Sequence, residues 1–327
     1  MANNRYAFFG GKFVDIADAK VSIMTHALNY GTGCFEGIRA YWNEEHKQLY
    51  VFRMPEHYRR MQDSCRILLI DLPYSVEELG ALTVELLRQE GFQEDTYVRP
   101  LAYKAQEGIG VRLKGIADAF ALFALPFGKY IQSEEGTRAC VSSWRRIYDT
   151  SIPARAKCTG AYVNSALSKT EAELNGFDEA IVLTHNGDVS EGSAENFFMV
   201  RDGTLVTPSI TSDILEGVTR NTIIQLAREQ LNIPVVERTV DRTELYVCDE
   251  AFFCGTGVQI AAITSIDHRS VGDGKLGPIT RQVRDLYFDT VRGRVPEYRH
   301  WCTPVFETES GRRLPATERS ANQPAAV

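Results

Sequence analysis

Residues 179–208 read EAIVLTHNGDVSEGSAENFFMVRDGTLVTP, and this stretch decides the fold class. Its apolar segments are interrupted at Asn186-Gly187 and Asp202-Gly203, and both dipeptides are typical of two-residue turns that join antiparallel strands. Two hairpins in such quick succession do not fit the regular strand–helix alternation of a doubly wound parallel sheet. The sequence therefore predicts an α+β fold with many short, often antiparallel strands.

The same kinds of signal predict further elements along the chain. Gly10-Gly11 separates two short strands in YAFFGGKFVDI, and Ser75 followed by Glu78 has the spacing of a capping box, which predicts a helix that ends near Gly91. Other helices are expected from Pro55, after Lys157, from about Thr219 and from Pro278. Further strands are expected at residues 48–52, 96–103, 119–127 and 139–144, and around Val235 and Phe252.

The chain has 327 residues, a length that corresponds to roughly two domains. The polar stretch KYIQSEEG, residues 129–136, is the expected interdomain loop. It would separate a small N-terminal domain, residues 1–128, from a larger domain, residues 137–300. Residues 301–327 are rich in Thr, Ser, Pro, Ala and charge without an apolar period, so this tail is expected to be disordered.

Composition and motif content exclude several classes of protein. The formal net charge is −7 and no Lys/Arg run stands out, which argues against a nucleic-acid partner. The seven cysteines are scattered without a CxxC pair, and no apolar run has the length of a leader or a membrane helix, so we expect a cytoplasmic protein with reduced thiols and no membrane contact. GxGxxG, HExxH and GxSxG are absent and the six histidines lack metal-ligand spacing, so no metal site is expected.

Lys157 stands among small residues in IPARAKCTGAYVNS, residues 152–165. A lysine amine with its free pKa of about 10.4 is almost wholly protonated at neutral pH. Shielding from water lowers that pKa, and the neutral amine can then condense with an aldehyde to form a Schiff base. The residues alone leave open whether Lys157 is such a group or an ordinary loop lysine.

Three more stretches contain groups suited to a charged ligand. SEGSAENFF, residues 190–198, places two glutamates around a glycine, and a buried carboxylate there would need a cationic partner such as a protonated ring nitrogen. EGVTRNT, residues 216–222, begins a predicted helix, whose free N–H groups favour an anion such as phosphate. CGTGVQI, residues 254–260, offers a second possible cradle after a strand. A solvated turn, a helix cap and a loop would explain the three stretches equally well when each is taken alone.

Seven ordered blocks of the sequence together match one family. They are HALNYGTGCFEGIRAY (26–41), FRMPEHYRRM (52–61), YVRPLAY (97–103), IPARAKCTGAYVNS (152–165), GDVSEGSAENFF (187–198), ILEGVTRNTII (214–224) and DEAFFCGTG (249–257). From about Tyr6 to about Thr290 the chain resembles the class IV, or fold-type IV, pyridoxal-phosphate aminotransferases, most closely the branched-chain amino acid aminotransferases. The resemblance implies a small N-terminal α/β domain and a larger C-terminal domain built around a pseudo-barrel of short strands.

The resemblance also implies that the cofactor is pyridoxal 5′-phosphate, and it assigns residues to that cofactor. Lys157 would be the catalytic residue, which holds the cofactor as a Schiff base and moves a proton once the substrate has freed it. Glu191 would keep the ring nitrogen protonated, and Tyr162 would bond the ring's phenolic oxygen. The phosphate ligands would be Arg60, Val218, Thr219 and Thr256.

For the substrate, the resemblance implies a pocket at the interface of a homodimer. Its residues would be Tyr97 and Gly257 for the α-carboxylate, Arg99, Tyr30 and Tyr130 for a distal carboxylate, and Phe35, Val111 and Phe127 for an apolar side chain. The implied reaction transfers an amino group from L-leucine, L-isoleucine or L-valine to 2-oxoglutarate. The alternatives are a D-amino acid transaminase, an (R)-amine transaminase or an aminodeoxychorismate lyase of the same fold, and a non-catalytic scaffold.

The sequence departs from the family pattern at a few positions. Ala161 replaces a usual asparagine, and Gly257 and Gln259 stand where alanine and glutamate are common. Because Gln259 removes a charge near the expected substrate turn, the substrate preference is less constrained than the cofactor chemistry. Lys104 adds a cation just after YVRPLAY, and the sequence assigns no role to it.

Overall fold

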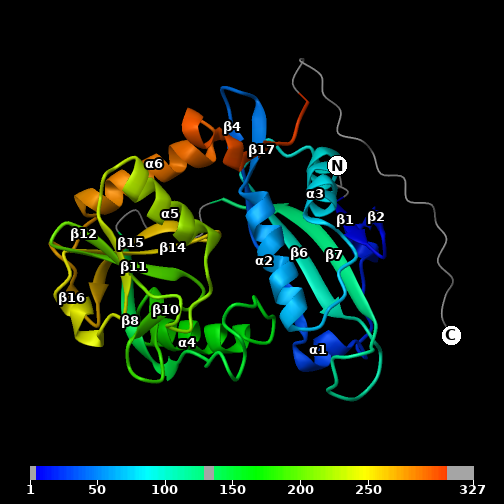
Figure 1. The fold of residues 1–327 in the computed structure, drawn as a ribbon, viewed down its shortest axis with the longest axis horizontal. Coiled ribbons are helices and arrows are strands. Elements are labelled where there is room, and N and C mark those ends of the chain that lie inside the picture. The colour runs from blue at the N-terminus through cyan, green and yellow to red at the C-terminus, as the bar shows by residue number, and fades with distance from the viewer. Residues whose placement is uncertain (1–4, 129–135, 308–327) are drawn as a thin grey trace.

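The computed structural model describes residues 5–128 and 136–307. The chain forms two lobes that lie side by side, each built on one β-sheet with helices packed against it (Figure 1). This mixed architecture confirms the predicted α+β class. Tyr130 and almost all of the expected interdomain loop lie outside the described residues.

The first lobe is built on an eight-stranded sheet in which every described pair of strands is antiparallel. Its strands in spatial order are β17 (Cys302–Pro304), β5 (Gln48–Phe52), β4 (Ile38–Asn43), β6 (Thr96–Lys104), β7 (Asp118–Pro126), β1 (Tyr6–Phe9) and β2 (Lys12–Asp15), with β3 (Gly33–Phe35) paired to β6. The predicted hairpin at Gly10-Gly11 joins β1 to β2, and both glycines have positive φ angles. Turn residues that tolerate positive φ therefore set this register.

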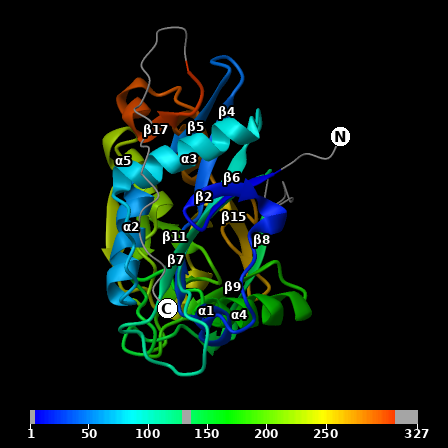
Figure 2. The same ribbon diagram turned by 90° about the vertical axis from the view of Figure 1, so that its right-hand side faces the viewer.

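Two long helices of this lobe, α2 (Met54–Ile67) and α3 (Val76–Glu90), pack against each other and share the apolar core of the sheet (Figure 2). The predicted capping box of α3 is present, because Ser75 and Glu78 each bond the other's backbone N–H, and Gly91 ends the helix in the left-handed conformation. The shorter helices before them are η1 (Ile16–Asp18) and α1 (His26–Tyr30). The apolar stripe of α2, exemplified by Tyr58 and Met61, is fully buried.

The second lobe is built on a nine-stranded mixed sheet that curls into a half-barrel (Figure 1). Its strands in spatial order are β10 (Val189–Gly192), β9 (Glu179–Leu183), β8 (Thr137–Arg145), β15 (Gln259–Ile266), β14 (Glu250–Gly255), β11 (Asn196–Arg201), β12 (Thr204–Pro208) and β13 (Val235–Arg238), with β16 (Arg269–Ser270) beside β15. Both predicted hairpins are confirmed, since β9 pairs with β10 and β11 with β12 in antiparallel fashion. β8 runs parallel to both of its neighbours, which no local signal in the sequence indicated.

Helices pack around this half-barrel and complete its cores. They are α4 (Tyr162–Leu174), α5 (Val218–Glu229) and α6 (Pro278–Val291), with the short helices η2 (Arg242–Tyr246) and η3 (Pro296–Trp301). Ile223 of α5 and Val283 of α6 are fully buried in one core with Phe252 of the sheet. Tyr41 and Phe52, which belong to the first lobe, enter the same core. The two lobes therefore share apolar packing.

The expectation of disorder from residue 301 onward is wrong for the first part of the tail. Cys302–Pro304 form β17, which pairs with β5, and Val305 is fully buried in the core of the first lobe. The polar composition of the tail as a whole hid a short segment, WCTPVF at 301–306, that has apolar side chains to bury. The second lobe's last helices thus lead the chain back to the first sheet, and residues 308–327 lie outside the described part.

Candidate active site

One cavity of about 480 Å³ lies between the lobes and collects most of the residues that the sequence singled out. The predicted residues that line it are Phe35, Arg60, Tyr97, Arg99, Phe127, Lys157, Tyr162, Glu191, Val218, Thr219, Thr256 and Gly257. They come from both sheets, from α2, from the N-termini of α4 and α5, and from the turn between β14 and β15. Residues that are up to roughly two hundred positions apart in the chain therefore meet in one place.

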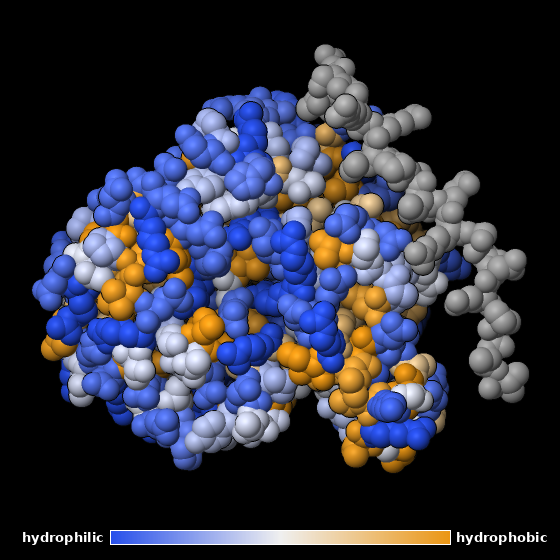
Figure 3. Space-filling model, in the orientation of Figure 1, coloured by the Kyte–Doolittle hydropathy of each residue, from blue (hydrophilic) through white to orange (hydrophobic). Residues whose placement is uncertain are grey.

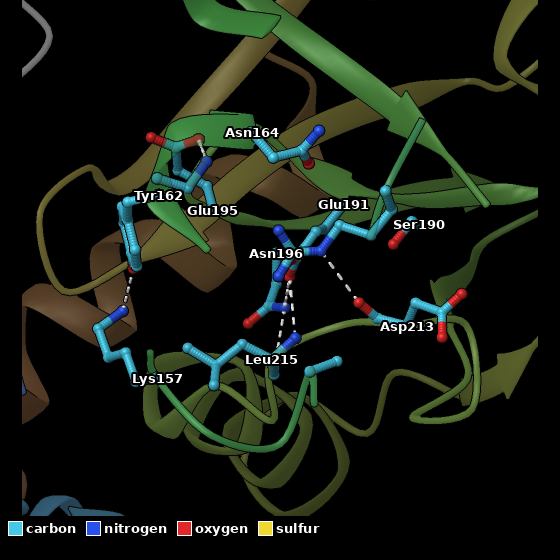
Figure 4. A network of polar contacts seen from close by, with 12 residues as sticks. Lys157, Tyr162, Asn164, Ser190, Glu191, Glu195, Asn196, Asp213 and Leu215 are labelled. Carbon is cyan, nitrogen blue, oxygen red and sulfur yellow. Dashed lines mark hydrogen bonds and ion pairs between the residues drawn. The ribbon is translucent and has the colours of Figure 1, made fainter. Parts of the chain in front are cut away.

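Lys157 lies in the cavity with its amine directed at a phenol. Its Nζ is 2.5 Å from the hydroxyl of Tyr162, the first residue of α4 (Figure 4). The backbone of Lys157 is held by the first lobe, since its N–H donates to Ser64 Oγ at 3.2 Å and its carbonyl accepts from the Phe35 N–H at 3.1 Å. A half-buried amine fixed in this way is not an ordinary loop lysine.

Glu191 is a buried carboxylate in β10 that accepts three donors. Oε1 pairs with Arg146 Nη2 at 2.9 Å, and Oε2 accepts from Asn196 Nδ2 at 2.9 Å and from the Leu215 N–H at 3.2 Å (Figure 4). Burial raises the pKa of Glu191, and the positive charge of Arg146 opposes that shift. The solvated-turn alternative for this stretch is therefore excluded. Arg146 was missed from the sequence, where nothing distinguishes it from other arginines.

Glu195, the second glutamate of this stretch, also lines the cavity. Its side chain is buried, and Oε2 accepts from the Ala194 N–H at 3.0 Å. Burial and the negative charge of nearby Glu179 raise the pKa of Glu195 to about 8. Two neighbouring carboxylates thus differ in environment, because Arg146 pairs with Glu191 alone.

The anion-binding end of the cavity is formed by Arg60 and the N-terminus of α5. Arg60 Nη1 donates to the Glu216 carbonyl at 2.8 Å, just before α5 begins. No side chain caps this helix at Gly217, so its first N–H groups remain available to an anion. A Cβ at Gly217 would lie 2.1 Å from Asn196 Oδ1, which explains why only glycine fits there.

Arg60 is itself fixed by a buried acid that sequence reasoning missed. Glu36 is completely buried and accepts from Arg60 and from His57 Nδ1, each at 2.7 Å. Burial by itself would raise the pKa of Glu36, but the charge of Arg60 and the bond from His57 lower it to about 2. Glu36 stands in the block FRMPEHYRRM's neighbour, HALNYGTGCFEGIRAY, yet no local pattern indicates that it would face Arg60.

The opposite wall combines aromatic rings with a second arginine. Arg99 Nη2 donates to the Tyr97 hydroxyl at 3.0 Å, and its guanidinium lies 4.4 Å from the ring centre of Phe35. Arg99 Nε is buried without a hydrogen-bond partner, which leaves this arginine with donor capacity for a ligand. Gly37 is required beside it, because a Cβ there would lie 2.1 Å from the Tyr97 hydroxyl oxygen.

Two residues assigned to the substrate do not line the cavity of the single chain. The Tyr30 hydroxyl accepts from the Gly110 N–H at 3.2 Å, and Val111 is 77% exposed. Both belong to an exposed region around α1 and the loop after β6, so the expectation that they reach their own chain's pocket is wrong. Tyr130, the third residue in question, falls outside the described residues.

The donors and acceptors of this cavity fit a phosphorylated pyridine aldehyde. An amine lies beside a phenol, a buried carboxylate lies in the same cavity, and an arginine with an uncapped helix N-terminus supplies anion donors. Each group answers to a different part of such a molecule.

Comparison with known proteins decides the family. The family model described as amino-transferase class IV matches residues 33–266. The chain belongs to the class IV aminotransferases.

Curated relatives and solved structures agree with this assignment. A probable branched-chain-amino-acid aminotransferase of Aquifex aeolicus is 48% identical over 92% of this chain and 97% of the relative. The branched-chain-amino-acid aminotransferase of Escherichia coli K12 is 40% identical, with the same two shares covered. The crystal structure of the branched-chain aminotransferase of Thermoproteus uzoniensis with norvaline matches with a TM-score of 0.88 and 45% identity, over 92% of this chain and 99% of that one.

Proposed function

We propose that this class IV aminotransferase uses pyridoxal 5′-phosphate to transfer the amino group of L-leucine, L-isoleucine or L-valine to 2-oxoglutarate. The observation that carries the proposal is the placement of the Lys157 amine 2.5 Å from Tyr162, in one cavity with the ion-paired carboxylate of Glu191. Relatives 40–48% identical over nearly the whole chain are named for this activity. Solved relatives include a PLP form from Thermobaculum terrenum and a Thermus form with pyridoxamine 5′-phosphate.

When bound, the cofactor supplies an electron sink that stabilises the negative charge left as the substrate's Cα proton departs. In the proposal Lys157 holds the cofactor's aldehyde carbon and later carries the Cα proton. Tyr162 orients the amine, and Glu191 keeps a proton on the ring nitrogen. The phosphate is held by Arg60, Val218, Thr219 and Thr256, which combine a guanidinium with helix N–H groups and hydroxyls.

The substrate side of the cavity offers both apolar and cationic surface. Phe35 and Phe127 present rings, and Arg99 lies against them with an unpaired donor. A hydrocarbon side chain would contact the rings, whereas the distal carboxylate of glutamate would pair with Arg99. The α-carboxylate common to both substrates would bind the Tyr97 hydroxyl and the turn at Gly257.

Homodimer formation is part of the same proposal. Large apolar side chains are exposed around α1, the loop after β6 and the outer face of α4, and Figure 3 shows orange side chains gathered over α1. They include Ile23 (84% exposed), Leu28 (62%), Ile109 (88%), Val111 (77%) and Val163 (65%). Contiguous exposed apolar surface of this kind marks a protein interface. A second copy seated there would bring its Val111 and Tyr30 toward the neighbouring cavity.

The cytoplasmic location remains a proposal as well. All seven cysteines are buried and free, which fits a reducing compartment. Within residues 5–128 and 136–307, no helix is long and apolar enough to cross a membrane.

Substrate assays test the activity directly. Purified protein is incubated with L-leucine, D-alanine or (R)-1-phenylethylamine, each with 2-oxoglutarate, and we expect glutamate to form with leucine. Absence of leucine turnover would defeat the branched-chain assignment, and turnover of one of the other donors alone would favour the corresponding alternative. A Lys157→Ala variant should lose activity and covalent labelling by borohydride. Retained labelling elsewhere, or no bound cofactor in the wild type, would favour the non-catalytic scaffold.

A further inference from the structure

Arg146 is a charged residue of the cavity to which the proposed function gives no role. It directly follows β8, and its Nη2 lies 2.9 Å from Glu191 Oε1. Building on the proposed cofactor, we infer that Arg146 is a positioning residue that keeps Glu191 ionised before the cofactor binds, so that the cofactor's ring nitrogen takes its proton from solvent.

The guanidinium of Arg146 is held in place independently of Glu191. Its Nε donates to the Asp213 carbonyl at 3.0 Å, and its backbone N–H donates to the Leu183 carbonyl at 2.8 Å. Asp213 has a φ angle of +55°, so its carbonyl is presented from a backbone conformation that most residues avoid. The Arg146 side chain is only 11% exposed. The cation therefore belongs to the folded protein and is in position whether or not a ligand is bound.

Glu191 needs this cation because neutral donors alone do not offset its burial. Asn196 and the Leu215 N–H supply two neutral bonds to one oxygen, whereas Arg146 supplies the charge on the other. A buried carboxylate without a cation takes up a proton instead of remaining charged. The geometry thus divides the work, with neutral groups fixing the orientation and Arg146 fixing the charge.

Other charged or titratable groups face Glu191 from every element around it. Lys157 approaches from the segment before α4, Arg220 from α5, Glu195 from its own hairpin and Cys254 from β14. Arg220 is committed elsewhere, since its Nη2 donates to Glu237 at 2.8 Å and to the Pro208 carbonyl. Glu195 acts against ionisation. In the described part of the chain, Arg146 is the cation within ion-pair distance of Glu191.

The proton balance differs with and without Arg146. With it, the site begins as a carboxylate, the ring nitrogen arrives without a proton, and one proton enters from solvent to form the N–H between them. Without it, Glu191 begins as a neutral carboxylic acid, and its own proton passes to the ring nitrogen or stays shared. Both routes end with a single proton between oxygen and nitrogen, but only the first takes that proton from the buffer.

Titration calorimetry measures this proton directly. Pyridoxal 5′-phosphate is titrated into apoprotein at one pH in two buffers that differ in ionisation enthalpy, and the slope gives the protons taken up per site. We expect Arg146→Met to take up about one proton fewer than the wild type. Protonation changes at Lys157 and at the phosphate are common to both proteins and cancel in the difference. Equal uptake by the two proteins would overturn the inference.

Matched variants separate charge from shape. Arg146→Lys keeps the charge and should retain the wild-type uptake, whereas a loss of uptake in that variant too would contradict the inference. Arg155→Met is the control, because Arg155 is a half-exposed arginine that pairs with Asp149 and Glu216 and not with Glu191. It should leave the proton uptake unchanged.

A second readout needs no cofactor and covers the case in which Arg146→Met binds it too weakly. The infrared difference between apoprotein and its Glu191→Gln variant should show an ionised carboxylate band in the wild-type background. In the Arg146→Met background that band should be replaced by the carbonyl band of a neutral acid, and persistence of the carboxylate band would refute the inference. Failure of the wild type to bind pyridoxal 5′-phosphate would instead count against the proposed function.

Discussion

Arg60 and Glu36 form a buried bidentate ion pair, with Nε 2.7 Å from one carboxylate oxygen and Nη2 2.7 Å from the other. The third nitrogen, Nη1, reaches the Glu216 carbonyl at 2.8 Å, where α5 is about to begin. Glu36 therefore fixes the plane of the guanidinium, and that plane faces the helix N-terminus proposed to bind phosphate. The acid acts on the ligand through the arginine that it holds.

Replacing Glu36 with glutamine should destabilise the apoprotein by about 3–5 kcal/mol at neutral pH, because it leaves Arg60 buried without its counter-charge. The pKa of Glu36 falls from 4.5 to about 2 on folding. Its contribution is therefore complete above the unfolded value and disappears as the pH falls through the folded value. Urea unfolding of both proteins from about pH 6 down to about pH 3 should show the gap narrowing at the acid end.

The matched control for this experiment is Glu56→Gln. Glu56 pairs with Arg53 at 3.2 Å, but its side chain is 29% exposed, so its loss should cost no more than about 1 kcal/mol. Similar losses from the two variants would show that the Glu36 pair is worth no more than a surface pair.

Removing the Tyr162 hydroxyl should impair chemistry without unfolding the protein. The hydroxyl lies 2.5 Å from Lys157 Nζ and touches the group proposed to move the proton. Tyr162→Phe should lower kcat about 10- to 100-fold, the range for losing one hydrogen bond to a charged group. Stopped-flow half-reactions with leucine measure the effect, and Tyr148→Phe, at a half-exposed tyrosine outside the cavity lining, serves as the control. An unchanged rate in Tyr162→Phe would remove the hydroxyl from the mechanism.

Lys104, which the sequence left without a role, forms a structural ion pair. It is 1% exposed, and its Nζ lies 2.8 Å from Asp118 and also contacts the Leu69 carbonyl at the end of α2. Lys104→Met should cost about 3–5 kcal/mol by leaving Asp118 buried and unpaired. Lys104→Met combined with Asp118→Asn should recover part of that loss in chemical denaturation. If the double variant were less stable than the single one, the ion-pair explanation would fail.

Arg39 ties the proposed substrate turn to the start of the interdomain segment. Nη1 donates to the Gly257 carbonyl at 3.3 Å, and Nη2 donates to the carbonyls of Phe127, at 2.6 Å, and Gly128. Arg39→Met should raise the KM for leucine about tenfold or more through loss of these charged bonds, with a smaller change in kcat. Arg39→Lys should not restore KM, because a single ammonium lacks the fork that spans three carbonyls. Full rescue by lysine would show that charge alone matters.

The proposed dimer can be dissected at the exposed loop after β6. Ile109→Asp combined with Val111→Asp should shift the protein toward monomer in sedimentation velocity, because two charges would be buried in an apolar interface. The control is Val236→Asp, since Val236 is 42% exposed on β13 of the other lobe. A wild type that sediments as a monomer at all concentrations would rule out the dimer.

Much of the local structure was readable from the sequence. The turns at Gly10-Gly11, Asn186-Gly187 and Asp202-Gly203 each lie where a hairpin was predicted, and Ser75 caps α3 as expected. These features depend on side chains within about four positions of one another, so the signal and the structure that it specifies are adjacent in the chain. The parallel pairing of β8 with β9 and β15 lacks such a signal and was not predicted.

The candidate site divides along the same line. The stretch around Lys157 and the glutamates of β10 are recognisable because the chemical groups stand in short, characteristic blocks. Arg146 and Glu36 are not, since they act through partners 45 and 24 positions away. Nothing in the letters on either side of them indicates which charge they will meet.

By itself the sequence determined where the chain turns, where helices begin, and which amine and acids belong to one family's chemistry. Only the tertiary structure decided that Glu191 is paired and Glu195 is not, that Tyr30 and Val111 face away from their own chain's cavity, and that Cys302–Pro304 return to the first sheet. The reason is physical: turns and caps are satisfied by neighbours in the chain, whereas the charge state of a buried group depends on what the fold brings against it from a distance.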